Sequence, residues 1–139
     1  MTTHNYPVLG VGAIVFRDDC ILLVKRKHPP EPARWAIPGG KVRFGENLCK
    51  AAEREIHEET GIIIKAREPV YTFEVIERDV GERTMLHYVV IDLLAEYVAG
   101  QPEANDDALD AAWVDRATFN NLDVNESTKA LLREKYNFP

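Results

Sequence analysis

The sequence has few cysteines, no surplus of basic residues and no long uncharged apolar run. Its 139 residues include two cysteines, Cys20 and Cys49, which are too few for a disulfide framework and too far apart for a metal knuckle. No apolar run approaches the roughly 18 residues of a membrane-spanning helix, and the N-terminal residues lack the pattern of a signal peptide. These absences predict buried free thiols, no membrane association and a cytoplasmic location.

The shortage of positive charge argues against a nucleic-acid-binding groove. There are 17 Lys and Arg against 23 Asp and Glu, a formal net charge of -6, whereas proteins that hold phosphate backbones need a surplus of basic residues. The charge is unevenly spread, with -3 in residues 46–59, -4 in residues 103–110 and +5 in residues 25–43. Such separation would place an acidic metal site beside a basic anion site, although charge runs are usually solvated faces.

The length and the apolar pattern predict one domain over residues 1–139, of the α/β class. Residues 84–98 fit a helix or a strand by spacing, and their Val and Ile residues favour a strand. A helix after Asn125 would be capped by that side chain. The expected strands are 8–16, 20–24, 35–37, 71–75, 84–98 and 112–114, and the expected helices are 46–60 and 126–136. This order predicts a mixed β-sheet covered by helices.

The expected helix at 46–60 carries carboxylates on its apolar face. At about 100° per residue, Glu55 and Glu59 share a narrow arc with small and apolar residues, with Glu58 on its flank. Carboxylates packed against a fold are costly by desolvation and repulsion, so a positive group must compensate. A divalent cation would do so, and oxygen ligands select Mg²⁺ or Mn²⁺ over Zn²⁺. Salt bridges from bases such as Arg54 are the alternative, and the helix alone favours neither.

The spacing of Gly, Glu, Arg and aliphatic residues over 40–62 resembles the Nudix box, written G-x5-E-x7-R-E-U-x-E-E-x-G-U with U aliphatic. All nine constrained positions match, from Gly40 and Glu46 to Arg54-Glu55-Ile56-His57-Glu58-Glu59-Thr60-Gly61-Ile62, and the lead Trp35-Ala36-Ile37-Pro38-Gly39-Gly40 is similar to the usual one. The resemblance implies an α/β/α sandwich with a mixed sheet and a catalytic loop–helix–loop. It also implies hydrolysis of a nucleoside diphosphate linked to another moiety, with Mg²⁺ or Mn²⁺ as cofactor.

The same resemblance implies roles for residues of the box. Arg54 would orient Glu55, and Glu46 would bind the metal through water or brace the loop. Metal bridging the pyrophosphate would stabilise developing charge and activate a water. The implied metal ligands are Gly39 (through its carbonyl), Glu55, Glu58 and Glu59; the implied catalytic residues include Arg54, Glu55 and Glu59; and Gly40, Glu46 and Gly61 are structural members of the motif.

The general base and the substrate-binding residues are expected outside the box. Asp107 is the candidate base among the acids Glu103, Asp106, Asp107 and Asp110, because its distance before the Trp113 strand is similar to that of the catalytic loop acid in some members of the family. A solvated turn that caps local backbone is the alternative. Substrate contacts are expected from Arg26, Arg34, Lys41 and Phe16, with Trp35, Phe44 and Tyr71 as further aromatic candidates; surface solubility and core packing are the alternatives.

The complete box and the compact length look most like the small ADP-ribose pyrophosphatase group, whose products are AMP and ribose 5-phosphate. Glu77 lies where many of those enzymes have a proline, so hydrolysis of sugar nucleotides or of (oxidised) nucleoside triphosphates stays an alternative. A non-catalytic nucleotide sensor is a remote alternative, since binding alone does not require Glu55, Glu58 and Glu59. The expected partner is a small nucleotide, with no nucleic acid and no membrane, and a homodimer is expected by analogy with relatives.

Overall fold

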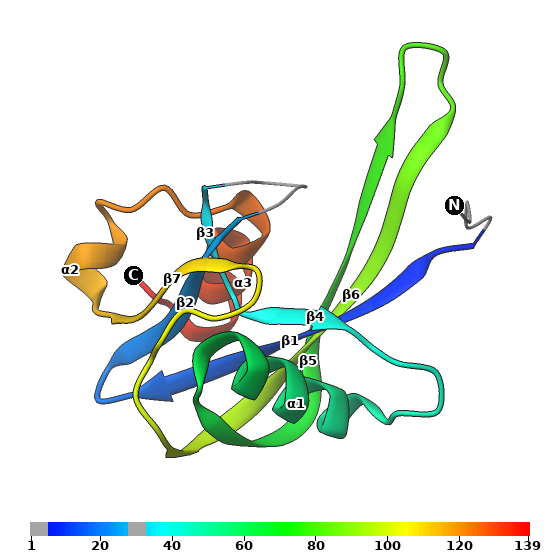
Figure 1. The fold of residues 1–139 in the computed structure, drawn as a ribbon. Coiled ribbons are helices and arrows are strands. Elements are labelled where there is room, and N and C mark those ends of the chain that lie inside the picture. Colours follow the sequence, from blue (N-terminus) through cyan, green and yellow to red (C-terminus); the bar gives the residue numbers. More distant parts are fainter. Residues whose placement is uncertain (1–5, 28–32) are drawn as a thin grey trace.

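The computed structural model describes residues 6–27 and 33–139. Seven strands and three helices follow one another in an order close to the one expected (Figure 1). The strands are β1 (Val8–Arg17), β2 (Cys20–Arg26), β3 (Trp35–Ala36), β4 (Gly39–Lys41), β5 (Ile63–Arg78), β6 (Thr84–Ala99) and β7 (Ala108–Val114), and the helices are α1 (Leu48–Thr60), α2 (Arg116–Phe119) and α3 (Glu126–Tyr136).

All seven strands join one mixed sheet. Its main path runs β3-β2-β1-β6-β5, while β4 pairs with β1 and β7 pairs with β2. The β1–β6 pair is parallel, and the other strand pairs are antiparallel. β1 lies at the centre and is buried from Gly10 to Val15, as expected for an apolar strand covered on both faces. The register places Gly12 of β1 between Gly39 of β4 and Asp92 of β6.

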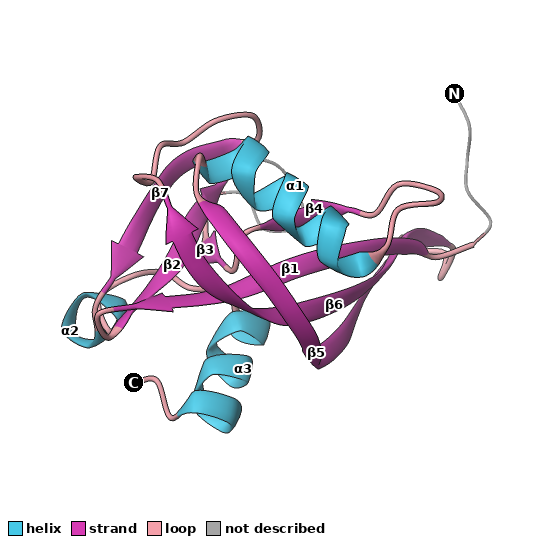
Figure 2. Cartoon of the chain, turned by 90° about the horizontal axis from the view of Figure 1, so that it is seen from below, coloured by secondary structure: helices cyan, strands magenta, loops and turns pink. Residues whose placement is uncertain are grey.

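Helices cover both faces of the sheet, so the expected α/β/α sandwich is confirmed. α1 lies on one face and α3 on the other (Figure 2). Helix α1 buries Ala51, Ala52 and Ile56, and helix α3 buries Leu131 and Leu132. None of the described helices is long and apolar enough to cross a membrane.

Local caps fix the ends of the helices. Helix α1 begins two residues later than expected because the Asn47 side chain accepts the Lys50 N–H at 2.9 Å and so caps the helix. It ends at Gly61, which has the expected left-handed conformation with φ 77° and donates its N–H to the His57 carbonyl. The predicted Asn125 cap of α3 is also present, with its Oδ1 accepting the Thr128 N–H at 2.9 Å.

The strand expected at 71–75 is longer at both ends in the structure. Strand β5 runs from Ile63 to Arg78, with register shifts on both sides of Pro69. Those irregularities let the strand continue past Pro69, which cannot donate a ladder hydrogen bond. Together with β6, whose strand character was expected, β5 forms a hairpin that extends beyond the body of the molecule (Figure 1).

Two further elements were not expected. The segment after Pro38, expected as a loop, forms the short strand β4 against β1, and α2 follows an Asp115 cap whose side chain accepts the Thr118 N–H at 2.7 Å. Strand β4 matters for the site because it places a Gly-Gly pair between the central strand and helix α1.

Candidate active site

The pair Gly39-Gly40 sits where backbone and side chains approach most closely. A Cβ on Gly39 would lie 2.1 Å from the Val11 carbonyl oxygen, and one on Gly40 would lie 2.0 Å from Glu55 Oε2. Neither position has room for a side chain. The Gly39 N–H donates to Glu59 Oε1 at 3.0 Å, so β4 is joined directly to the carboxylate face of α1.

Arg54 binds three of the motif carboxylates at once. Its Nε and Nη2 donate to the two oxygens of Glu46 at 2.7 and 2.9 Å, while Nη1 donates to Glu55 Oε1 at 2.6 Å and to Glu58 Oε2 at 3.3 Å. Nη2 also donates to the Lys41 carbonyl at 3.0 Å. The Arg54 hydrogen bonds lower the pKa of Glu46 to about 2, with a smaller contribution from the Arg43 backbone N–H.

Glu59 differs from these three carboxylates. It is 6% exposed, and no Lys, Arg or His in the described ranges forms an ion pair with it within 4.0 Å. Burial raises its pKa to about 7, although the Arg26 charge and the Gly39 N–H act in the opposite direction. The Glu55 and Asp107 carboxylates add to the rise. Glu59 is therefore a buried carboxylate beside other carboxylates, and a positive charge placed next to it would stabilise its ionised form.

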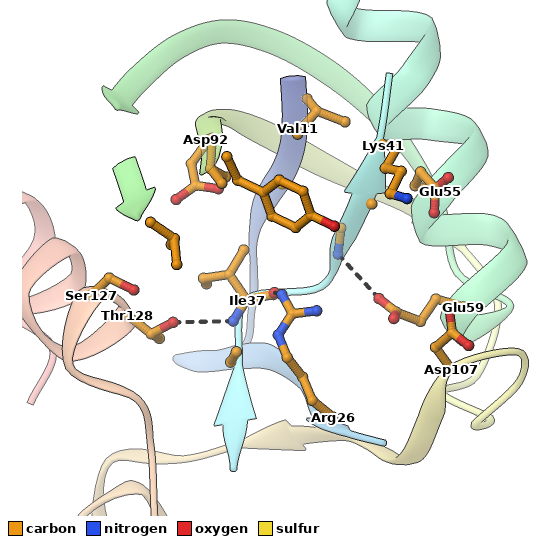
Figure 3. A pocket seen from close by; sticks show the side chains of 18 of the residues that line it. Val11, Arg26, Ile37, Lys41, Glu55, Glu59, Asp92, Asp107, Ser127 and Thr128 are labelled. Atoms are coloured by element: carbon orange, nitrogen blue, oxygen red, sulfur yellow. Dashed lines mark hydrogen bonds between the residues drawn. The ribbon is translucent and has the colours of Figure 1, made fainter. Parts of the chain in front are cut away.

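A cavity of about 680 Å³ opens beside this helix face. At one end lie Glu55, Glu59, Lys41 and Asp107; at the other lie Asp92, Ser127 and Thr128, with Arg26 and Ile37 between them (Figure 3). Arg26 is held by its Nη2, which donates to the Ile37 carbonyl at 3.1 Å. The sheet supplies an apolar wall that includes Phe73, Val75, Tyr88 and Val90. The cavity thus has an acidic end, a basic middle and a mixed far end.

The donor set at the acidic end fits a hard divalent cation. Glu55, Glu58 and Glu59 line it, and no Cys or His among residues 6–27 and 33–139 does. Carboxylate oxygens are the ligands that Mg²⁺ and Mn²⁺ prefer. In the described ranges, no three acidic, His or Cys side chains stand together closely enough to enclose an ion, and Glu55 and Glu58 turn instead to Arg54. Both alternatives left open by the sequence therefore use the same carboxylates: Arg54 pairs with them, and a cation would draw them toward Glu59.

The structure brings together most of the residues that the sequence singled out. Gly39, Gly40, Glu55, Glu58, Glu59, Arg26, Lys41 and Asp107 all line the cavity. Arg54 and Glu46 lie directly behind, joined to Glu55 and to each other. Gly61 is the C-cap of α1, two residues after Glu59, and is not among the residues that line the cavity.

Two expected substrate residues are not among those that line the cavity. The Arg34 Nε donates to Asp123 Oδ1 at 3.1 Å, and the Phe16 ring packs against Tyr136 and Phe138 at centroid distances of 5.2 and 5.7 Å. Phe16 lies further along β1 than Gly12, where it packs against the core cluster that includes Leu131 and Phe138. The other aromatic candidates also lie elsewhere: Trp35 and Tyr71 pack against the core, and Phe44 is fully exposed.

Sequence reasoning missed Asp92, a buried carboxylate in the middle of β6. It is 3% exposed and lines the cavity, and no hydrogen bond to its side chain exists in the described part of the chain. Burial raises its pKa to about 7, against the opposing charge of Arg26. The available signal was a single acid within the apolar run Val89 to Ala95, since a buried strand rarely contains an unpaired charge.

Comparison with known proteins gives one consistent result. The model of the NUDIX domain matches residues 7–134. An ADP-ribose pyrophosphatase from Methanocaldococcus jannaschii is 36% identical over 119 residues, covering 86% of this chain and 66% of its own length. A putative 8-oxo-dGTP diphosphatase 2 from Mycobacterium tuberculosis is 34% identical over 127 residues, covering 84% and 78%. The crystal structure of a MutT NUDIX hydrolase from Burkholderia pseudomallei aligns with TM-score 0.74 and 30% identity, covering 94% of this chain and 99% of that one.

The raised pKa of Asp92 predicts a pH-dependent gain in stability for Asp92→Asn. Between about pH 4 and pH 7 the folded state binds this proton more tightly than the unfolded state does, so the wild type loses stability as the pH rises. Asn has no charge to bury. The advantage of the variant in unfolding free energy should therefore grow by on the order of 2–3 kcal/mol from pH 5 to pH 8, measured by urea unfolding without divalent metal.

Glu96→Gln is the matched control for that measurement, because Glu96 lies on the same strand with its side chain 60% exposed. Its carboxylate lies at the surface and pairs with the Arg67 guanidinium, and exposed ion pairs contribute little to stability, so this variant should show no comparable growth. A stability difference for Asp92→Asn that stays constant from pH 5 to pH 8 would contradict the account of Asp92 as a buried, uncompensated carboxylate.

Proposed function

The chain belongs to the Nudix family of hydrolases, and we propose that its substrate is a nucleoside diphosphate linked to another moiety, with ADP-ribose first among candidates. Water would cleave the pyrophosphate bond of ADP-ribose to give AMP and ribose 5-phosphate. The observation that carries the reaction class is the cavity whose acidic end is formed by Glu55, Glu58 and Glu59 and whose middle holds Arg26. The ADP-ribose pyrophosphatase from M. jannaschii supports this choice of substrate.

The cofactor in this proposal is Mg²⁺, with Mn²⁺ as a substitute, held by Glu55, Glu58, Glu59 and the Gly39 carbonyl. When bound, such an ion neutralises charge on the pyrophosphate and lowers the pKa of a coordinated water. The protein then supplies position and field. The Gly39 N–H orients Glu59 by donating to its carboxylate, and Arg54 orients Glu55 by donating to its Oε1.

The basic side chains would act on the phosphates. Arg26 and Lys41 line the cavity on the approach to the carboxylates, where they can neutralise the phosphate oxygens that the cation leaves free. Asp107 lines the same end and would accept a proton from the attacking water. Its segment is tied to the strand that carries Arg26, because the Lys27 N–H donates to the Asp107 carbonyl at 2.9 Å.

Hydrolysis of nucleoside triphosphates, including oxidised ones, is the second candidate. The relative described as a putative 8-oxo-dGTP diphosphatase supports it, and the acidic end of the cavity would serve either substrate because it holds the pyrophosphate and not the base. A single domain over residues 1–139, a homodimer and a cytoplasmic location stay predictions from the sequence.

A substrate panel tests this proposal. Purified protein with Mg²⁺ is offered ADP-ribose, sugar nucleotides, dinucleoside polyphosphates, NADH and nucleoside triphosphates with their oxidised forms, and products are resolved by chromatography. We expect ADP-ribose to have the highest kcat/KM, with AMP and ribose 5-phosphate as products. Preference for a triphosphate would replace ADP-ribose by the second candidate, and turnover of none, together with nucleotide binding, would indicate a sensor.

The carboxylates of α1 should be essential for turnover and dispensable for folding. Glu59→Gln and Glu55→Gln keep the volume of each side chain and remove the charge that a cation needs, so each should lose about 3 kcal/mol of transition-state stabilisation, roughly 100-fold in kcat/KM. Glu134→Gln, at an exposed position on α3, is the control and should leave kcat/KM unchanged. Near-native turnover by folded Glu59→Gln would contradict the assignment.

Asp107 is predicted to be the general base, and its pH–rate profile can show this. Asp107→Asn should lower kcat by about 10²–10⁴-fold and remove the acidic limb of the profile. Asp110→Asn is the control and should leave the profile unchanged. The Asp110 carboxylate accepts the Ala111 N–H at 2.8 Å, and Asp110 is not among the residues that line the cavity. If Asp106→Asn, at the other acid of this loop that lines the cavity, changed the profile in place of Asp107→Asn, the base would have been misassigned.

A further inference from the structure

The far end of the cavity holds a carboxylate that no role above uses. Asp92 is 3% exposed, and in the ranges 6–27 and 33–139 no donor hydrogen-bonds to its side chain. Its carboxylate faces the cavity from the side opposite Glu55 and Glu59 (Figure 3). An ionised carboxylate has only acceptor oxygens, and those of Asp92 are open to the cavity, where a ligand that brings donors can reach them.

The surrounding backbone makes room for this carboxylate. Gly12 lies beside Asp92 in the parallel β1–β6 register, and a Cβ on Gly12 would lie 2.3 Å from Asp92 Oδ1. The absence of a side chain at Gly12 is therefore what allows the carboxylate to lie over the central strand.

Its position relative to the acidic end is set by the sheet. Gly12 pairs with Asp92 on one side and with Gly39 on the other, so two strand spacings, about 10 Å, separate Asp92 from the Gly39 backbone at the proposed metal site. A pyrophosphate held at the acidic end would thus leave its attached sugar or base to reach toward Asp92.

The other groups at this end are one positive charge, an apolar wall and hydroxyls. The Arg26 charge acts on Asp92, and the wall beside it consists of Tyr88 and Val90. Thr128 contributes a hydroxyl whose oxygen already accepts the Ile37 N–H at 3.3 Å. The far end therefore combines an apolar wall with one strong acceptor to which no donor of the described residues is hydrogen-bonded.

We propose that Asp92 determines specificity by accepting hydrogen bonds from two adjacent donors on the moiety attached to the pyrophosphate. The chemistry that fits is the vicinal diol of a ribose or the neighbouring N1–H and 2-amino groups of guanine. The inference rests on the proposed function, because the acidic end must hold the pyrophosphate for this moiety to reach Asp92. A site with a buried polar group rejects analogues that lack its partner, because the group is then left unpaired.

Two ligand pairs test this without any hydrolysis. Calorimetry in the presence of Mg²⁺ compares ribose 5-phosphate with 2-deoxyribose 5-phosphate, which lacks the diol, and GMP with IMP, which lacks the 2-amino group. The wild type should prefer the complete donor pair by about 10-fold or more in at least one comparison, and that comparison identifies the source of the donors. Asp92→Asn should reduce the preference to less than twofold, because the amide replaces one of the two acceptor oxygens by an NH₂ group that only donates.

Two further variants make the result unambiguous. Gly12→Ala displaces the carboxylate while keeping Asp92, and should abolish the same preference; Glu96→Gln, on the same strand but exposed, should retain it. No preference in either pair for the wild type, or an unchanged preference in Asp92→Asn, overturns the inference. Failure of the proposed function is separate, since it shows as absence of turnover across the substrate panel while these binding ratios are still measured.

Discussion

The site depends on how closely a pair of glycines lets three elements approach one another. Gly39 lies against Val11 of the central strand and Gly40 against the Glu55 carboxylate, with no space for a Cβ at either position. This contact allows the Gly39 N–H to reach Glu59 and keeps the carboxylate face of α1 directed at the sheet. Larger residues would push α1 away from β4, and the acidic end of the cavity would open.

Both ends of the cavity contain a buried carboxylate, and the two carboxylates differ in the positive groups around them. At the acidic end, Arg54 shares its guanidinium among Glu46, Glu55 and Glu58 and leaves Glu59 buried with a raised pKa. At the far end, Asp92 has only the distant influence of Arg26. Both carboxylates line the same cavity, so the occupant that we propose would carry positive charge to one end and hydrogen-bond donors to the other. A metal-bound nucleotide meets both demands.

The sequence predicted most of the charged residues that line the cavity, including Arg26 in its middle, but not Asp92 at its far end. The motif places Glu55 and Glu59 one turn apart on a helix, a local relation that spacing alone specifies. The roles of Phe16 and Arg34 depended on which way a strand and a loop face, which only the assembled sheet decides. Strand β5 was underestimated because Pro69 is tolerated through register shifts that no local pattern reveals. Asp92 was missed because its significance comes from Gly12, a residue far away in sequence and adjacent in the sheet.

The central claim is that Glu55 and Glu58 release Arg54 and, together with Glu59, bind a divalent cation beside Gly39. Crystals grown with Mn²⁺ and a non-hydrolysable ADP-ribose analogue test it through the anomalous signal of manganese. The account predicts a peak bounded by the oxygens of Glu55, Glu58 and Glu59 and by the Gly39 carbonyl. A peak elsewhere, or none while Glu55 and Glu58 stay paired with Arg54, would contradict it.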